Sequence, residues 1–242
     1  MSHSKISLKE AAEYLHIPVT DLQYLVDKGK IPARKERGHV WILKSDLQDW
    51  ANQFILQPGD QRLGRSHYSA THIWSGLGNV SRSLSDFLFP AAMEPGLRAR
   101  TKPSVLRELT RVALRTNLVC DSDKLLRYVQ DREALHPTGL KEGVAIPHPR
   151  FHTPDLFFES FLVIARIPGG VPFGAMDGEE SDLFFMPCTT SEHDHTFCLS
   201  RLTTLLKKTP LAAELRRAES AQEMMEAVKS LEEQILGTFA KK

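Results

Sequence analysis

One histidine of this chain stands in a setting that suits nucleophilic chemistry. His148 follows a short apolar run at 144–146 and lies between Pro147 and Pro149. Each proline fixes its own φ angle and biases the preceding residue toward extended geometry, so the segment that carries the imidazole is stiff. A neutral imidazole nitrogen held in this way can be aimed in line at phosphorus. On spacing alone, however, the commoner alternative of a histidine with structural hydrogen bonds in a turn is favoured.

A metal site is the competing chemistry for the histidines. Zinc prefers imidazole ligands, and four histidines could converge on one cleft: His148, His152, His193 and His195. A helix that presents the first two of these on one face is disfavoured, because Pro149 and Pro154 would interrupt it. We therefore expect neither a bound metal nor a cofactor.

Residues 83–242 must position His148, and their pattern alternates between helices and strands. Apolar spacing predicts helices from Ser104, near Asp123, from about His195 and after Ser220. Apolar runs of strand length lie at 144–147, 161–167 and 183–186, with a turn signal at 177–178. This mixture favours an α/β (α+β) fold in which helices flank a mixed β-sheet.

The first 57 residues predict a small separate domain. Capping boxes at Ser7 with Glu10, Thr20 with Gln23 and Ser45 with Gln48 indicate three helix starts. The first two helices meet across a tight turn, which is typical of a helix-turn-helix. Segments 31–33 and 39–43 then flank a basic tip at 34–38, which indicates a β-hairpin wing.

Composition limits the class of protein. Of the 242 residues, 41% are hydrophobic and 25% charged, which excludes a disordered tail or a fibrous repeat. The net charge of +1 gives no sign of a nucleic-acid coat or a membrane-surface binder. No apolar run approaches the roughly 20 residues that cross a bilayer, and three well-separated cysteines suit a reduced, cytoplasmic protein. Residues 58–82 resemble a linker in composition, so we expect domains at 1–57 and 83–242.

The N-terminal segment is similar to the excisionase-type (MerR-like) winged helix-turn-helix family. The similarity is carried, in order, by Ser7–Leu15, Gly29–Ala33 and Trp41–Leu47. It implies that the second helix enters a major groove and that the wing contacts the DNA backbone. The residues expected on duplex DNA are Thr20, Gln23, Tyr24, Lys28, Arg34, Lys35 and Arg37. Phosphates would repel Asp21 and Asp27 on the same helix, so a protein-docking role for this face stays open.

Residues 84–236 resemble the enzyme IIA domain, fructose–mannitol type, of the bacterial phosphoenolpyruvate phosphotransferase system. The resemblance is carried by Arg132–Leu135, Thr138–Leu140, Gly143–His148, Phe173–Gly178 and Glu192–Leu206, and it is nearest to the nitrogen-regulatory members. It implies that His148 is the phosphorylated histidine, that Arg132 lines the site and that His195 is a second histidine beside it. Pro149 stands where the family often has Gly or Ala, and it has no amide N–H to offer a phosphate.

Each of these residues has an expected role and an alternative. Arg132 would offer forked donors to the equatorial oxygens of the phosphoryl group, or else form a surface ion pair with Glu133 or Asp131. His195 would donate as a neutral imidazole at the start of a helix, or merely cap that helix while His193 serves instead. Thr138 would orient His148, whose ring we expect to be uncharged and to face outward.

Together the two segments predict a cytoplasmic regulator linked to the phosphotransferase system. It would accept a phosphoryl group on His148 from an HPr-like carrier and control transcription or a protein partner. Helix-turn-helix modules usually bind paired half-sites, so we also expect a homodimer, and no membrane partner. Two alternatives stay open: a non-catalytic interaction scaffold that uses the enzyme IIA fold, and a sugar-permease IIA subunit acting in trans. Whether such a histidine phosphocarrier is itself an enzyme is left undecided.

Overall fold

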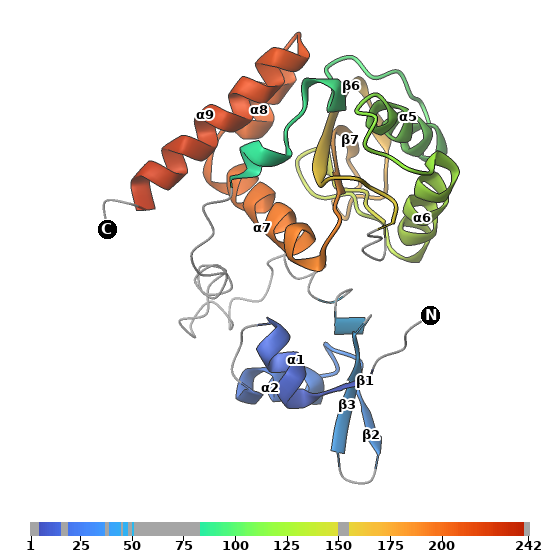
Figure 1. Cartoon of the computed structure of the whole chain (residues 1–242), viewed down its shortest axis with the longest axis vertical. Coiled ribbons are helices and arrows are strands. Elements are labelled where there is room, and N and C mark those ends of the chain that lie inside the picture. The colour runs from blue at the N-terminus through green and yellow to red at the C-terminus, as the bar shows by residue number, and fades with distance from the viewer. Residues whose placement is uncertain are drawn as a thin grey trace. The chain divides into compact units, whose positions relative to one another are not determined.

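The computed structural model describes residues 5–15, 19–36, 39–44, 46, 47, 50, 83–149 and 155–239. It divides the chain into two compact units, Met1–Ser81 and Arg82–Lys242 (Figure 1). The second unit thus begins one residue before the predicted boundary at 83. The predicted linker at 58–82 lies outside the described residues and stays a prediction.

In its described residues the first unit has the helices α1 and α2 and a three-stranded sheet, and Lys44, Asp46, Leu47 and Trp50 are helical as well. Its elements are β1 (Lys5–Ser7), α1 (Leu8–Leu15), α2 (Val19–Asp27), β2 (Arg34–Glu36) and β3 (His39–Leu43). Strand β3 is central and pairs antiparallel with β1 on one side and with β2 on the other. The buried core consists of Ala11, Ala12, Leu22, Leu25, Ile31, Ile42 and Leu47.

The predicted capping box at the start of α1 is confirmed. The Glu10 carboxylate accepts from the Ser7 N–H at 2.7 Å, and the Glu10 N–H donates to the Ser7 hydroxyl oxygen at 3.3 Å. Other local predictions for this unit are wrong. Thr20 caps no helix, because α2 already begins at Val19, and the first wing strand lies at 34–36 rather than 31–33. The third predicted box, Ser45 with Gln48, lies outside the described residues.

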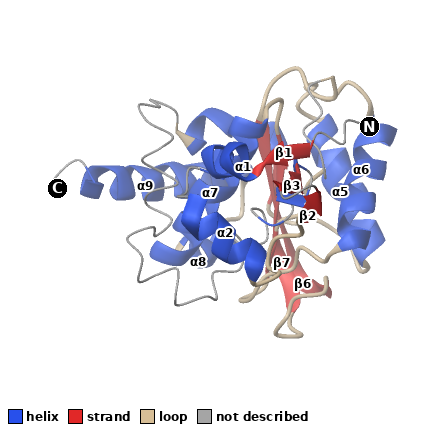
Figure 2. Cartoon of the chain, turned by 90° about the horizontal axis from the view of Figure 1, so that it is seen from below, coloured by secondary structure: helices blue, strands red, loops and turns tan. Residues whose placement is uncertain are grey.

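The second unit is a mixed sheet with helices on both faces, as predicted (Figure 2). Its elements are η1 (Leu84–Phe87), η2 (Pro90–Ala92), β4 (Met93–Glu94), α5 (Lys102–Leu114), α6 (Ser122–Leu135), β5 (Val144–Ala145), β6 (Phe161–Pro172), β7 (Glu180–Cys188), α7 (Glu192–Lys208), α8 (Leu211–Arg217) and α9 (Ala221–Phe239). The strand order is β4-β6-β7-β5. Strands β6 and β7 are antiparallel, while β4 and β5 add in parallel at the two edges. No helix in the described ranges has both the length and the apolar character to cross a bilayer.

The long strands β6 and β7 are buried on both faces. Phe161, Val163 and Ala165 of β6 share a core cluster with residues of α5 and α6. Successive strand residues point to opposite faces, so the intervening Leu162 and Ile164, which are also buried, face the layer of α7, α8 and α9 (Figure 1). Burial on both faces explains why this stretch is a continuous apolar run in the sequence rather than an alternating one.

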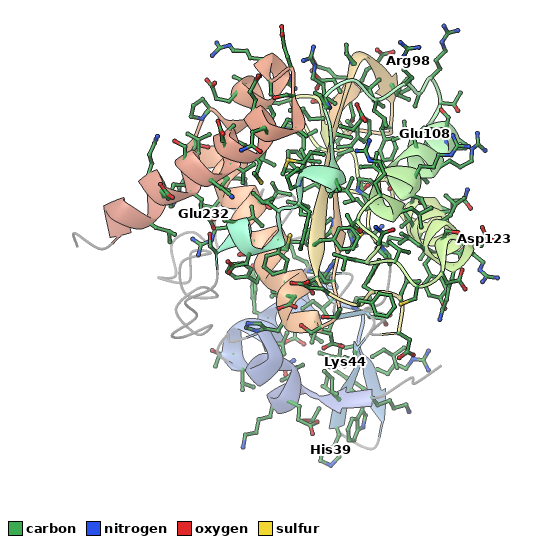
Figure 3. The ribbon with its side chains drawn as sticks, turned by 45° about the horizontal axis from the view of Figure 1, so that its top comes forward. His39, Lys44, Arg98, Glu108, Asp123 and Glu232 are labelled. Atoms are coloured by element: carbon green, nitrogen blue, oxygen red, sulfur yellow. The ribbon has the colours of Figure 1, made fainter. Side chains whose placement is uncertain are left out.

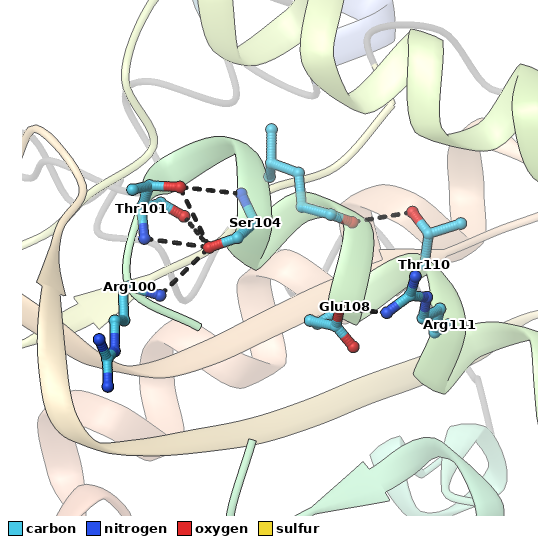
Figure 4. A network of polar contacts seen from close by, with 7 residues as sticks. Arg100, Thr101, Ser104, Glu108, Thr110 and Arg111 are labelled. Atoms are coloured by element: carbon cyan, nitrogen blue, oxygen red, sulfur yellow. Dashed lines mark hydrogen bonds and ion pairs between the residues drawn. The ribbon is translucent and has the colours of Figure 1, made fainter. Parts of the chain in front are cut away.

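Helix α5 begins two residues before the predicted Ser104. Thr101 is the N-cap: its hydroxyl oxygen accepts from the Ser104 N–H at 3.3 Å, and the Ser104 hydroxyl oxygen accepts from the Thr101 N–H at 3.0 Å (Figure 4). Pro103 fits the first turn because the N–H that it lacks would have no partner in the helix. Ser104 is therefore the third helical residue, and it forms a capping box with Thr101.

A buried carboxylate of α9 holds the start of the second unit. Glu232, 1% exposed, accepts from the N–H groups of Leu84 at 2.7 Å and Ser85 at 3.1 Å, and from the hydroxyls of Ser83 and Ser85. It also forms an ion pair with Arg201 of α7 at 3.3 Å. Figure 3 shows Glu232 beside η1. Charged groups removed from water need such partners, so this contact joins α7 and α9 to η1.

Gly139 tolerates no side chain, which gives a test of the packing. A Cβ there would lie 2.7 Å from the backbone nitrogen of Ala175 and 3.0 Å from its Cα. We expect Gly139→Ala to lower the free energy of unfolding by about 1–3 kcal/mol in urea denaturation, because overpacking forces backbone shifts. Gly96→Ala is the control, since no atom lies within 4 Å of its Cβ position. Equal losses in the two variants would contradict the close approach.

Candidate functional site

Short strand β5 places His148 at the edge of the sheet. The strand pairs in parallel with β7 on one side. On its other side the Leu140 N–H donates to the Val144 carbonyl at 2.7 Å, and the Ile146 N–H donates to the Thr138 carbonyl at 3.1 Å. The segment that ends at His148 is therefore held between a buried strand and the chain at 138–140.

One hydrogen bond orients the imidazole of His148. Its Nδ1 lies 2.8 Å from the carbonyl oxygen of Ile146. A carbonyl oxygen can only accept, so Nδ1 carries the proton and Nε2 keeps the lone pair. Nε2 is buried and has no hydrogen-bond partner among the described residues. The residue has an exposed fraction of 0%, so the expectation that its ring faces outward is wrong.

The surroundings of His148 keep its ring neutral. Burial holds the pKa of His148 well below its usual value of 6.5, and the nearby His195 and Arg132 lower this pKa further. The hydrogen bond to Ile146 acts in the opposite direction but does not outweigh them. The uncharged ring that the proposed chemistry requires is therefore the stable form near pH 7.

Arg132 reaches the site from the last turn of α6. It is 3% exposed, and its Nη1 donates to the carbonyl oxygen of His136, just past the end of the helix, at 2.8 Å. Its charge is close enough to depress the pKa of His148. The alternative prediction of a surface ion pair with Glu133 or Asp131 is wrong, because Arg132 is buried. Glu133 pairs instead with Lys102 at 2.8 Å.

His195 brings a second imidazole from α7. The ring centroids of His148 and His195 are 5.0 Å apart, with 53° between the planes. Helix α7 begins at Glu192 with Ser191 as its N-cap, three residues before the predicted start. The His195 N–H donates to the Ser191 carbonyl at 3.0 Å. A ligand would therefore meet the imidazole of His195 rather than its amide.

Thr138 connects to His148 through the backbone. Its hydroxyl donates to Glu133 at 2.6 Å, so the hydroxyl is already engaged, while its carbonyl accepts from Ile146. Its orienting role stays a prediction. Sequence reasoning did not identify the Glu133–Thr138 hydrogen bonds, although only five residues separate the two. It also missed the pairing of Lys102 with Glu133, which are 31 residues apart and which no local spacing relates.

The metal alternative finds no support in the described residues. They contain no group of three or more His, Cys, Asp and Glu side chains that could hold a metal ion. His152, one of the four histidines considered, lies outside the described ranges.

The candidate DNA-binding residues lie on α2 and β2 and in the turn after α2. Thr20, Tyr24, Lys28, Arg34 and Lys35 are exposed and Gln23 is half-buried, while Arg37 lies outside the described residues. The Gln23 amide donates to the Asp27 carboxylate at 2.9 Å, and the Lys28 ammonium lies 5.8 Å from the centroid of the Tyr24 ring. The exposed Lys28, Arg34 and Lys35 give this face cations that a polyanion could meet.

Known families match both units. Residues 87–231 match the family described as "Phosphoenolpyruvate-dependent sugar phosphotransferase system, EIIA 2", and residues 6–54 match "Helix-turn-helix domain". The nitrogen regulatory protein of Bradyrhizobium diazoefficiens is 30% identical over 142 residues, which cover 57% of this chain and 90% of that protein. The fructose-specific EIIABC component of Bacillus subtilis is 25% identical over 147 residues, 60% of this chain but 23% of that protein. The chain thus spans about a quarter of that relative.

A solved structure shares the fold of the second unit. Nitrogen regulatory protein IIA-Ntr from Neisseria meningitidis superposes with a TM-score of 0.53 at 22% identity, over 60% of this chain and 98% of that one. With the match to the helix-turn-helix family, this confirms the predicted fold class. His148, Arg132, Thr138 and His195 all lie within the region of the first family match.

The lowered pKa of His148 predicts a loss of stability in acid. Below about pH 6.5 the ring takes up a proton in the unfolded chain but not in the folded one, so the free energy of unfolding falls as the pH decreases. This contribution amounts to at most about 1.4 kcal/mol per pH unit. We expect His148→Gln to lose less stability than the wild type between pH 7.5 and pH 5 in urea denaturation. Parallel pH dependences would contradict a buried neutral ring.

Proposed function

Because the chain belongs to the phosphoenolpyruvate-dependent sugar phosphotransferase system EIIA 2 family and carries a helix-turn-helix domain, we propose that it accepts a phosphoryl group on Nε2 of His148. One observation carries the proposal. The imidazole is buried, neutral and bound through Nδ1, while Nε2 has no partner among the described residues. A buried polar atom without a partner needs an explanation, and a phosphoryl acceptor provides one.

The arrangement suits transfer from a phosphohistidine. The Nε2 lone pair of His148 attacks phosphorus in line while the P–N bond to the donor breaks, and the electron pair of that bond returns to the donor ring. His148 keeps its Nδ1 proton, which stays bonded to the Ile146 carbonyl. Charge on the equatorial oxygens is then stabilised by the Arg132 guanidinium and the His195 imidazole, since positioning and electrostatics dominate such reactions.

The two units in one chain support a regulatory role. Because His148 keeps its Nδ1 proton, transfer of a PO3⁻ group would make the second unit more negative by about one charge, less than the 1.5–2 charges that a phosphorylated hydroxyl gains. The match to a helix-turn-helix family, beside the similarity to a nitrogen regulatory protein, supports a regulator over a sugar-permease subunit. The proposal therefore places the chain in the cytoplasm, with an HPr-like carrier as donor and transcription or a protein partner as target.

Labelling tests the acceptor directly. With phosphoenolpyruvate, enzyme I and HPr, the wild type should gain acid-labile label, and His148→Ala should gain less than a hundredth of it, because the attacking nitrogen is gone. Arg132→Lys should be labelled at least tenfold more slowly, because a lysine cannot offer forked donors to the phosphoryl oxygens.

His193→Ala is the matched control for this assay. His193 is exposed and lies two residues from His195 on the same helix, so its loss should leave the label unchanged. Equal labelling of wild type and His148→Ala would refute the acceptor assignment. A wild type that takes no label would instead favour the interaction scaffold.

We also propose that the first unit binds duplex DNA through α2 and the wing. The exposed cations Lys28, Arg34 and Lys35 and the match to a helix-turn-helix family support this interpretation. Phosphate contacts release counterions, so binding of this kind weakens steeply with salt. Helix-turn-helix modules usually bind as dimers, and a homodimer remains part of the proposal.

The salt dependence of binding tests the DNA interface. Replacing Arg34 and Lys35 by alanine should weaken binding to a random-sequence duplex and reduce the slope of log K against log salt by up to about 1.8, or about 0.9 for each phosphate that is no longer neutralised. Fluorescence anisotropy between 50 and 200 mM salt measures both quantities. The control replaces the exposed Arg107 and Arg127 of the second unit, which changes the net charge equally. The same slope in all three proteins would contradict the assigned interface.

A further inference from the structure

Glu133 is a buried carboxylate beside the site that the transfer chemistry does not use. It follows Arg132 in α6, and its side chain is 3% exposed. Its oxygens accept from the Thr138 N–H at 3.1 and 3.2 Å and from the Thr138 hydroxyl at 2.6 Å. The Lys102 ammonium forms an ion pair with it at 2.8 Å. Charge-assisted hydrogen bonds are strong, so these contacts hold Thr138 firmly.

Hydrogen bonds connect Thr138 to His148, the proposed phosphoacceptor. Its carbonyl accepts from the Ile146 N–H at 3.1 Å, and a bridge between Gly139 and Ala145 extends the same pairing. The carbonyl of Ile146 in turn binds Nδ1 of His148 at 2.8 Å. A continuous series of hydrogen bonds therefore runs from the Glu133 carboxylate to the imidazole.

The connection acts through position rather than charge. The pKa of His148 is lowered by burial, by His195 and by Arg132, whereas Glu133 is not among the causes. The ion pair with Lys102 balances the charge of this carboxylate. Glu133 therefore fixes the position of the Ile146 carbonyl. That position decides which ring nitrogen of His148 carries the proton.

We propose that Glu133 is a positioning residue that keeps His148 in its Nδ1–H tautomer, acting through Thr138 and Ile146; this inference rests on the proposed phosphoryl acceptance. Without the carboxylate, Thr138 loses its anchor and the Ile146 carbonyl shifts. The Nε2–H tautomer then becomes populated, and in that form Nε2 has no lone pair to attack phosphorus. Transfer slows in proportion to the decrease in the fraction of reactive rings.

The test compares Glu133→Gln with the wild type in the full chain. The substitution keeps the size of the side chain but removes its charge and turns an NH₂ group toward donors. The ¹⁵N shifts of labelled histidine report the tautomer of His148 before any donor protein is present. We expect the Nδ1–H form in the wild type and a substantial Nε2–H population in the variant, with an initial labelling rate at least threefold lower per folded molecule.

Glu232→Gln is a matched control. Glu232 is also buried, and it too accepts from backbone N–H and hydroxyl groups and pairs with a cation, but it holds η1 rather than the site. Its substitution should lower stability yet leave the tautomer and the labelling rate per folded molecule unchanged. Thr138→Ser keeps the hydroxyl and should retain the wild-type tautomer. Thr138→Val removes only the hydroxyl contact. It should shift the tautomer of His148 in the same direction as Glu133→Gln but by less. If Glu133→Gln does not fold, the result for Thr138→Val decides the question.

The outcomes separate this inference from the function on which it rests. An unchanged His148 tautomer in Glu133→Gln, or in Thr138→Val where the first variant does not fold, would overturn the positioning role even if the wild type accepts label. A tautomer change in Glu232→Gln equal to that in Glu133→Gln would also overturn it, because a general loss of stability would then explain both. A shifted tautomer together with a wild type that takes no label would support the positioning role and refute phosphoryl acceptance.

Discussion

The hydrogen bond between Nδ1 of His148 and the Ile146 carbonyl determines what this site can do. It assigns the ring proton to one nitrogen and leaves the lone pair on the other. Burial, together with the nearby Arg132 and His195, keeps the ring from taking up a second proton. The remaining chemistry follows from this state, because a neutral imidazole is a nucleophile and an imidazolium is not.

The fold holds this bond with short elements that have little stability of their own. Strand β5 is only two residues long, and it keeps its place because β7 pairs with one side and the chain at 138–140 with the other. Helix α6 supplies both Arg132 at the ring and Glu133 behind it, while α7 supplies His195. The burial of β6 and β7 on both faces gives these pieces a rigid support, as close-packed interiors do.

The sequence predicted the parts of this arrangement that are local. The run from Gly143 to His148 pointed to the proposed acceptor, and helical spacing located the starts of α5, α6, α7 and α9 to within a few residues. The predicted starts of α5 and α7 came a few residues after the observed ones. Their N-caps, Thr101 and Ser191, are polar residues that an apolar pattern does not mark. The burial of the His148 ring could not be predicted, since it depends on contacts between segments that the sequence does not relate. The pairing of Lys102 with Glu133 across 31 residues is such a contact.

The central claim is that Nε2 of His148 receives the phosphoryl group while Nδ1 keeps its proton. The most direct measurement is NMR of the ¹⁵N-histidine-labelled, phosphorylated chain, in which ¹⁵N–³¹P coupling identifies the bonded nitrogen. The account predicts coupling at Nε2 of His148, with Nδ1 still protonated. A phosphoryl group on Nδ1 of His148, or on either nitrogen of His195, would contradict it.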